Sequence, residues 1–304
     1  MAHAHHHTHT HIPDRRNFGR NFAIATVLNA ALVVAQVVYG FLANSLALLA
    51  DAGHNFGDVI GLVLAWLAFV FASWRPSDRY TYRMQGASIL AALANAVLLL
   101  VATGAIGWEA LRRFAEPVEV ATTPVMIMAA IGVAVNGVSA LFLRHGRKSD
   151  LNVNGAFVHM MADAGVSVAV LAAAFGIYLT GWQWLDPVAG LLIAAVILGG
   201  TWSLLRESLR LSLNAAPSTV DPAAVQDWLE TRPEVRGVHD LHIWAMSTTA
   251  TAMSCHLVMA SHPGNAFLHE LADELEHRFN IGHPTIQIEL AGVGKCPVEH
   301  DHAA

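Results

Sequence analysis

Six long apolar stretches limit what this chain can fold into more than any other feature. Each is long enough to cross the hydrocarbon core of a bilayer, which takes about 20 helical residues. Of the 304 residues, 55% are hydrophobic and only 13% are charged, which is too apolar for a soluble chain of this length. The sequence therefore predicts an α-helical membrane protein, with six transmembrane helices at 21–42, 45–73, 84–108, 120–143, 152–180 and 187–205.

Positive charge alternates between the predicted loops. Arginines and lysines precede the first span, follow the last one and fill the second and fourth loops. By the positive-inside rule, both termini and these two loops face the cytoplasm, with Arg112 and Arg113 of the third loop as the exception. We expect a multi-pass protein in the lipid bilayer of a bacterial inner or plasma membrane. The net charge of −6 offers no basic stripe for nucleic acid, which is not expected as a partner.

A capping signal stands at the start of the sixth span. Asp186 is followed by Pro187, and this order is typical of a helix N-cap and the first helical residue. The two residues are therefore interpreted as the structural beginning of that span.

The composition changes after about residue 213, where a small α+β domain is predicted. Asp221 and Pro222 indicate the cap and first residue of a helix that ends near Glu230. Two β-rich runs, a helix and a strand follow at 238–246, 251–259, 266–279 and 285–290, so the order is αββαβ. The predicted division is a His-rich disordered tail at 1–17, the transmembrane domain at 18–212, this cytoplasmic domain at 213–292 and a flexible tail at 293–304.

Ionisable residues are almost excluded from the six predicted spans. The exceptions are Asp51, His54, Asp58, His159 and Asp163. A charge near the middle of a bilayer costs at least about 2.5–3.5 kcal/mol, so such residues usually face a partner or a cavity and mark an ion path. His54 and Asp58 share one helix face at i, i+4 spacing, and His159 and Asp163 repeat that spacing on the fifth span. The two spans run in opposite directions, so the pairs can meet at one depth.

Two imidazoles and two carboxylates are a suitable ligand set for a tetrahedral cation of borderline softness, such as Zn²⁺, Cd²⁺ or Co²⁺. A single His–Asp pair could equally be a hydrogen bond between helices. Two matching pairs favour a metal site formed by His54, Asp58, His159 and Asp163. Asp51, one turn before His54, could be a fifth ligand, an acceptor for an imidazole N–H or a packing contact, and we favour the latter two.

Three motifs resemble the cation diffusion facilitator family, and its zinc-transporting branch in particular. The run from Asn44 to Asn55 with Asp58 is similar to that branch's second span, and the run from His159 to Asp163 is similar to its fifth. The segment 238–244 is similar to the start of the sheet in the family's cytoplasmic domain. The resemblance implies a homodimer of six-span protomers, a ferredoxin-like cytoplasmic domain and metal export in exchange for protons, with the four residues above as transport ligands.

The chain departs from the family pattern in a few places. Gln36 stands where members often carry a Glu in the first span, and Gly86 and Ser88 stand where they carry an Arg and a Glu at the start of the third. Some bacterial relatives have a second metal site between spans two and three, but here residues 77–84 offer only Asp78 as a ligand. We expect that second site to be missing.

Histidines also gather outside the spans. The N-terminal string of His3, His5, His6, His7, His9 and His11 is either a purification tag or a native metal-gathering tail, and we favour the tail because Ala and Thr interrupt it. In the cytoplasmic domain His239 and His256 fall on neighbouring predicted strands and form a candidate regulatory zinc site. The remaining histidines of the domain are interpreted as solvated surface residues.

The combined reading is a divalent metal efflux transporter, with zinc and protons as its exchanged ions, that works by alternating access through the intramembrane site. Protons and metal would compete for the same carboxylate and imidazole atoms. A membrane metalloenzyme is the first alternative, but it needs a base or nucleophile beside the metal, and apart from Asp51 the spans contain no spare one. A metal-sensing receptor is the second, and it leaves the ligands in the spans unexplained. We expect no catalysis and no cofactor.

Overall fold

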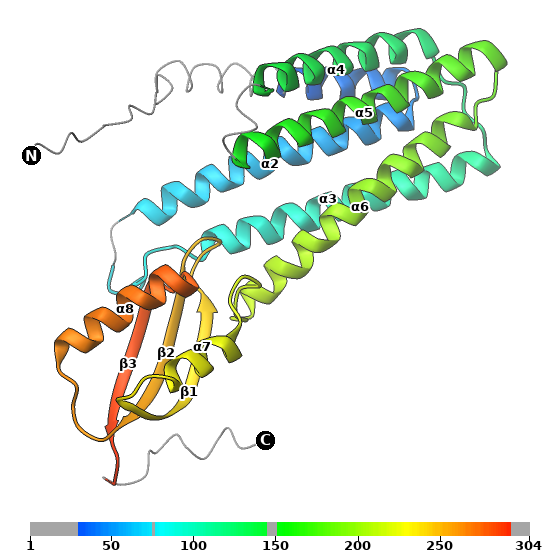
Figure 1. Ribbon diagram of the computed structural model, residues 1–304. Helices are drawn as coiled ribbons and strands as arrows, with labels where there is room; N and C mark the ends of the chain where they lie inside the picture. The colour runs from blue at the N-terminus through cyan, green and yellow to red at the C-terminus, as the bar shows by residue number, and fades with distance from the viewer. Residues whose placement is uncertain (1–29, 75–76, 145–150, 293–304) are drawn as a thin grey trace, which may run out of the picture. The chain divides into compact units, whose positions relative to one another are not determined.

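The computed structural model describes residues 30–74, 77–144 and 151–292 (Figure 1). After a helix at Ala30–Leu42 come α2 (Leu46–Ser73), α3 (Ala87–Ala115), α4 (Thr122–Leu143), α5 (Leu151–Thr180) and α6 (Leu185–Ser212). The C-terminal elements are α7 (Pro222–Glu230), β1 (Val235–Ala245), β2 (Thr251–Met259), α8 (Asn265–Phe279) and β3 (His283–Leu290). The chain forms two compact units, one of residues 1–60 with 99–198 and one of residues 61–98 with 199–304.

The N-terminal two-thirds of the chain is a helical membrane domain. Within the described residues, four helices are long and apolar enough to cross a membrane: Ala87–Ala115, Thr122–Phe142, Phe157–Thr180 and Leu185–Ser212. The helix at Ala30–Leu42 is apolar but shorter. The two predicted tails, 1–17 and 293–304, and the beginning of the first predicted span lie outside the described residues.

Helices α3 and α6 extend well past the spans drawn from hydropathy, and α6 ends at Ser212, although its span was expected to end at residue 205. The third span was expected to end at residue 108, but α3 continues to Ala115 and includes Arg112 and Arg113. Ion pairs between side chains three and four residues apart hold this last stretch, among them Glu109 to Arg113 at 3.2 Å. Hydropathy marks the end of the apolar segment, whereas the helix ends where its side-chain pairs run out.

Asp186 caps a different helix from the one expected. Since α6 begins at Leu185, Asp186 lies inside its first turn. Its carboxylate accepts hydrogen bonds from the backbone N–H groups of Leu46 and Ala47 at the start of α2. A helix end can be capped by a side chain that is distant in the sequence, and a local Asp–Pro pattern does not reveal this.

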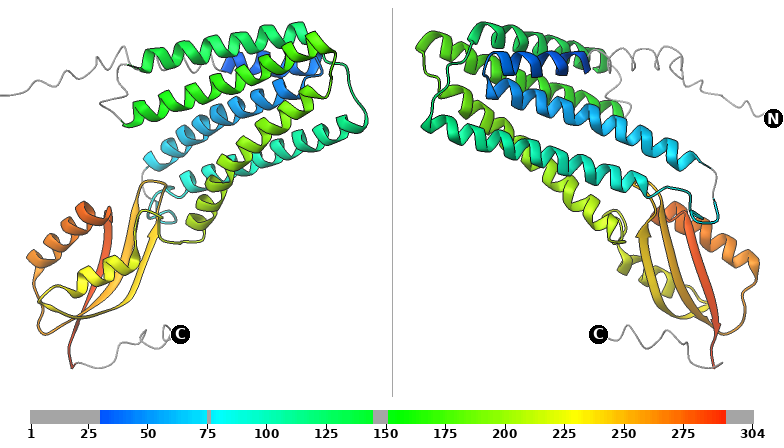
Figure 2. Two further views of the ribbon diagram at one scale, coloured as in Figure 1. Left: turned by 45° about the vertical axis from the view of Figure 1, so that its right-hand side comes forward. Right: turned by 180° about the vertical axis from the view of Figure 1, so that it is seen from behind.

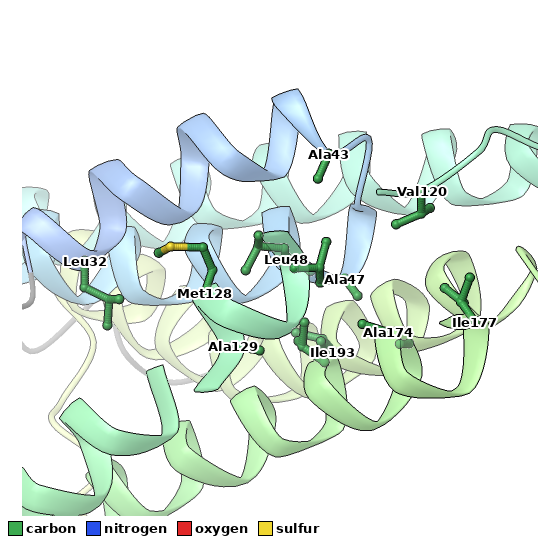
Figure 3. Close-up of a cluster of buried hydrophobic side chains, with 14 of the residues drawn as sticks. Leu32, Ala43, Ala47, Leu48, Val120, Met128, Ala129, Ala174, Ile177 and Ile193 are labelled. Carbon is green, nitrogen blue, oxygen red and sulfur yellow. The ribbon is translucent and has the colours of Figure 1, made fainter. Parts of the chain in front are cut away.

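Alanines and larger aliphatic side chains fill the core of the first unit. They come from the Ala30–Leu42 helix, α2, α4, α5 and α6, with Leu48, Ala129 and Val170 fully buried (Figure 3). Alanines at these positions let helices approach closely, which stabilises helix contacts in a bilayer where lipid tails are as apolar as leucine. In both views of Figure 2, α4 and α5 run side by side, so α5 is held on one flank by α4.

The second unit contains a small α/β domain with a three-stranded sheet of order β1-β2-β3. β1 pairs antiparallel with β2, and β2 pairs parallel with β3 through the α8 crossover. Helices α7 and α8 cover one face of the sheet, where they bury Met253, Cys255 and Leu257 (Figure 2). The observed order αββαβ is the predicted one, β2 has the predicted bounds, and Asp221 caps α7 through a 3.0 Å bond from the Ala223 N–H.

Candidate metal centre

Helices α2 and α5 bring the two His–Asp pairs together in the first unit. The His54 Nε2 atom lies 3.1 Å from Asp163 Oδ1, so each pair contacts the other across the helices. The His159 Nε2 atom lies 3.2 Å from Asp58 Oδ2 and 3.6 Å from Asp163 Oδ2. These four residues are called the membrane cluster below. Their contacts follow from the i, i+4 spacing, which stacks each pair on one helix face.

The ligand atoms of the membrane cluster are close enough to share one cation. One atom each of His54, Asp58 and Asp163 lie within 4.8 Å of one another, and His159 joins them through its contacts with both carboxylates. Asp163 Oδ2 is buried and accepts no hydrogen bond from the described residues. A buried carboxylate oxygen without a donor is costly. The donor set therefore fits a bound cation, which would satisfy that oxygen.

The members of the membrane cluster differ in their exposure. The side chains of His159 and Asp58 are 42% and 38% exposed, whereas that of Asp163 is 1% exposed. Asp58 lies further along α2 than His54, and His159 lies nearer the beginning of α5 than Asp163. Access is therefore greater toward the C-terminal end of α2 and the N-terminal end of α5.

A buried polar layer lies next to the membrane cluster, on the side of Asp51. Asp51 is fully buried, and its Oδ2 atom accepts hydrogen bonds from Gln36 Nε2 at 2.7 Å and Ser167 Oγ at 3.1 Å. Asn55 Nδ2 bridges to Gln36 Oε1 at 3.2 Å. A Cβ atom on Gly132 would lie only 2.7 Å from Ser167 Oγ, so the α4 backbone seals this layer.

The layer assigns a role to Asp51 among those that the sequence left open. Its carboxylate holds together the Ala30–Leu42 helix, α2 and α5 through amide and hydroxyl donors. Within the described residues it is bonded to these donors and does not belong to the group of candidate metal ligands. Sequence reasoning missed Ser167 and Asn55, although uncharged polar residues in apolar spans were a signal that could have found them.

A second cluster lies on the sheet, on the face opposite α7 and α8. His239 on β1 is the register partner of His256 on β2, and their ring centroids are 5.0 Å apart. Glu289 on β3 bridges them, with its carboxylate oxygens 3.1 Å from His239 Nε2 and 2.9 Å from His256 Nδ1. One ligand atom of each residue lies within 4.8 Å of the others. These three residues are called the sheet cluster below.

The other histidines of the domain have different surroundings. His242 contacts Asp240 at 3.0 Å, His277 contacts the Asp273 carbonyl at 2.8 Å, and the His283 ring meets Tyr82 edge to face. In the part of the chain that the structure describes, none of these joins the sheet cluster.

The two parts of the chain match two families. Residues 22–211 match the cation efflux transmembrane domain, and residues 217–291 match the cytoplasmic domain of cation efflux proteins. Together they account for most of the chain.

Full-length relatives agree with this match. The chain is 38% identical to the metal cation efflux system protein CzcD of Cupriavidus metallidurans, over 90% of this chain and 87% of that protein. It is 37% identical to the zinc transporter ZitB of Escherichia coli, over 95% and 93% of the two chains. It is 33% identical to the cadmium, cobalt and zinc/H⁺–K⁺ antiporter of Bacillus subtilis, over 88% and 87%. The chain therefore belongs to the cation efflux family, and its resemblance to the zinc-transporting branch of the cation diffusion facilitators is confirmed.

Proposed function

We propose that the protein exports Zn²⁺, or a similar divalent ion such as Cd²⁺ or Co²⁺, through the membrane cluster. The observation that carries this proposal is the meeting of four ligand residues from two helices around a buried carboxylate oxygen of Asp163 that accepts no hydrogen bond within the described part of the chain. Two nitrogen and two oxygen ligands suit zinc better than a hard ion that prefers only oxygens. The names of the relatives, a zinc transporter and a cadmium, cobalt and zinc antiporter, support the same ion class.

Proton exchange follows from the contacts within the cluster. His54 Nε2 and His159 Nε2 each face a carboxylate oxygen at 3.1–3.2 Å, a distance at which the two atoms can share one proton. The same atoms are the metal ligands. Binding of a cation must release those protons, and reprotonation must release the cation. This competition supports antiport, and it uses no catalytic step or cofactor.

The openness of the cluster supports the direction of loading. We place six spans in the membrane with both termini in the cytoplasm, so the exposed side of His159 and Asp58 faces the cytoplasm. The buried layer around Asp51 then separates the membrane cluster from the outer side of the membrane. In this conformation the site accepts an ion from inside, and export requires a second conformation in which the layer opens.

The same proposal includes the domain division expected from the sequence. The His-rich tail at 1–17 gathers metal, residues 18–212 form the transporter, residues 213–292 form a ferredoxin-like cytoplasmic domain, and residues 293–304 form a tail. The match to a dimerisation-type cytoplasmic domain supports a homodimer. A domain of about 80 residues gains stability from such a partner.

Flux into proteoliposomes tests the proposal. Purified wild-type protein should move Zn²⁺ in the direction opposite to the protons that run down an imposed gradient. Asp58→Ala or Asp163→Ala should lower the Zn²⁺ flux to the level of empty liposomes. Asp227→Ala, an exposed carboxylate on α7, is the matched control and should keep the wild-type rate. Wild-type flux in both cluster variants, with folded dimers verified by size-exclusion chromatography, would remove the transport role from these residues.

The sheet cluster supports a second metal role, in regulation. Its three residues come from three adjacent strands and already contact one another, which is a typical arrangement for a site that holds an ion. We propose that zinc binds there and stabilises the cytoplasmic domain. Zinc titration of the full-length protein in detergent should detect one fewer ion per protomer in His256→Ala. An unchanged number of bound ions would exclude the site.

A further inference from the structure

The first turn of α2 is bound by a carboxylate from another helix. Ser45 Oγ donates to Asp186 Oδ1 at 2.6 Å, the Leu46 N–H donates to Oδ2 at 2.6 Å, and the Ala47 N–H donates to Oδ1 at 3.2 Å. The side chain of Asp186 is 2% exposed. The N-terminal N–H groups of a helix lack partners within the helix and attract negative charge, so this carboxylate satisfies both needs.

The carboxylate is neutralised by an arginine that the positive-inside rule left unexplained. Arg113 Nη1 lies 3.5 Å from Asp186 Oδ2 and also donates to the carbonyl of Asn44, just before α2. The Arg113 side chain is 10% exposed, and its Nε donates to Glu109 at 3.2 Å. A buried carboxylate is costly without a cation beside it. Arg113 is therefore a structural partner of Asp186.

The backbone around α2 is shaped to receive Asp186. Asn44 has a left-handed φ of +56°, which turns the chain sharply into the helix. A Cβ atom on Gly190, one turn after Asp186, would lie 3.3 Å from the Cβ of Leu46, so α6 packs directly against the first turn of α2. Ser45 Oγ meanwhile accepts a bond from the Leu48 N–H at 3.1 Å. The beginning of α2 is thus fixed along its axis and in its rotation.

We propose that Asp186 is a positioning residue for ion binding at the membrane cluster, which it controls through α2. This inference rests on the transport role proposed for the cluster. His54 follows Leu46 by eight residues on one continuous helix, which is about 12 Å along its axis. A helical segment of this length is stiff, so it transmits a shift or rotation of the first turn of α2 to the ligands. Asp186 therefore sets the direction in which His54 and Asp58 face α5.

The decisive experiment is zinc flux as a function of zinc concentration for Asp186→Asn. An amide keeps one acceptor oxygen but turns an NH₂ group toward a backbone N–H, so one of the two backbone bonds is lost. The zinc concentration for half-maximal flux should rise about ten- to hundredfold, as for other groups that orient metal ligands. The maximal flux per folded dimer should stay within about threefold of wild type. A purely structural role would lower the amount of folded dimer without changing the half-maximal concentration.

Two further variants keep the test decisive. Asp221→Asn is the matched control, because Asp221 caps its own helix α7 and asparagine caps equally well. It should leave the half-maximal concentration unchanged. Ser45→Ala removes one bond to Asp186, together with the bond that Ser45 Oγ accepts from the Leu48 N–H, and should raise the half-maximal concentration about threefold. It takes the place of Asp186→Asn if that variant does not fold.

Arg113→Gln separates the capping role from the ion pair. It keeps every bond between Asp186 and α2, so its effect should be smaller than that of Asp186→Asn. An equal or larger effect, or wild-type half-maximal concentrations in both Asp186→Asn and Ser45→Ala, would overturn the inference. The inactive Asp58→Ala variant reports on the cluster itself, so failure of the positioning role is distinguishable from failure of the transport role.

Discussion

The membrane cluster and the sheet cluster use the same two kinds of side chain on different backbones. In the membrane the ligands come in two pairs, one from α2 and one from α5, and in the described residues no backbone hydrogen bond joins these helices. In the sheet the donors come from three neighbouring strands whose backbones are hydrogen-bonded in a fixed register. The first set of ligands can separate when two helices move, whereas the second cannot separate without breaking the sheet.

This difference in backbone support predicts which of the two clusters would release a bound ion more readily. Release during each cycle requires ligands that move apart or rotate at low cost, and helix pairs can do this. Ligands on a hydrogen-bonded ladder hold their spacing, so we expect an ion bound there to leave more slowly than one bound between two helices. The same chemistry therefore suits transport in one region and lasting stabilisation in the other.

The largest expected difference is in ion preference. His54→Asp makes the membrane cluster richer in oxygen, so zinc should lose about tenfold in flux relative to cadmium, which tolerates longer bonds and more oxygen ligands. His239→Asp makes the equivalent change in the sheet cluster and should leave the preference unchanged. The measurement is competitive zinc and cadmium flux in proteoliposomes under one pH gradient. Equal shifts in the two variants would abolish the distinction between the clusters.

A second test compares how metal affects stability. Zinc at a hundred times its dissociation constant should stabilise the cytoplasmic domain by about 2.7 kcal/mol, since binding favours only the folded state. Thermal unfolding should therefore occur several degrees higher with zinc than with EDTA, and His256→Ala should remove the difference. His54→Ala is the control and should keep it. A zinc effect that survives in His256→Ala would place the stabilising ion elsewhere.

A third and smaller effect concerns how firmly α2 and α5 are held together. The Ser167–Asp51 bond joins these helices one turn from the membrane cluster. Ser167→Ala removes a bond to a carboxylate worth about 1.5–3 kcal/mol and should lower the thermal midpoint of the membrane domain by a few degrees. Ser218→Ala, at an exposed position after α6, is the control. An unchanged midpoint for Ser167→Ala would mean that the layer does not hold the helices.

The smallest expected signal tests the rigidity of the sheet. Burial raises the pKa of the Cys255 thiol from 9.0 to about 12, so at pH 8 its reactive thiolate is about a thousandfold scarcer than that of an ordinary cysteine. In a Cys296→Ser background, alkylation by iodoacetamide at pH 8 should be very slow in the folded protein and fast in urea, as measured by mass spectrometry. The rate should increase as the pH approaches 12. Rapid labelling at pH 8 would indicate a sheet that opens readily.

Local patterns in the sequence predicted much of this molecule. The i, i+4 spacing of His54 and Asp58 predicted that both side chains share one face, and the alternation along β2 gave its bounds because one face of that strand is buried. The Asp221 cap was also predictable, since donor and acceptor are two residues apart. In each case the relevant partners are neighbours in the sequence or follow one helical or strand period.

Contacts between distant residues could not be predicted in this way. Asp186 and Leu46 are separated by 140 positions, and nothing near Asp186 indicates that its carboxylate belongs to α2. Arg113 was placed in a loop because hydropathy ends before the helix does. Ser167 was overlooked because an uncharged residue costs little in an apolar helix, although it completes the hydrogen bonding of a buried carboxylate.

The buried layer around Asp51 has a consequence for the proton gradient across the membrane. A membrane that stores a proton gradient loses it through any continuous wet path, even a narrow one. Four helices meet at this layer, and Gln36, Asp51 and Ser167 are fully buried in it. Under the antiport proposed above, each opening on the far side has to follow a closing on the near side, so that every exported ion is exchanged for protons that enter.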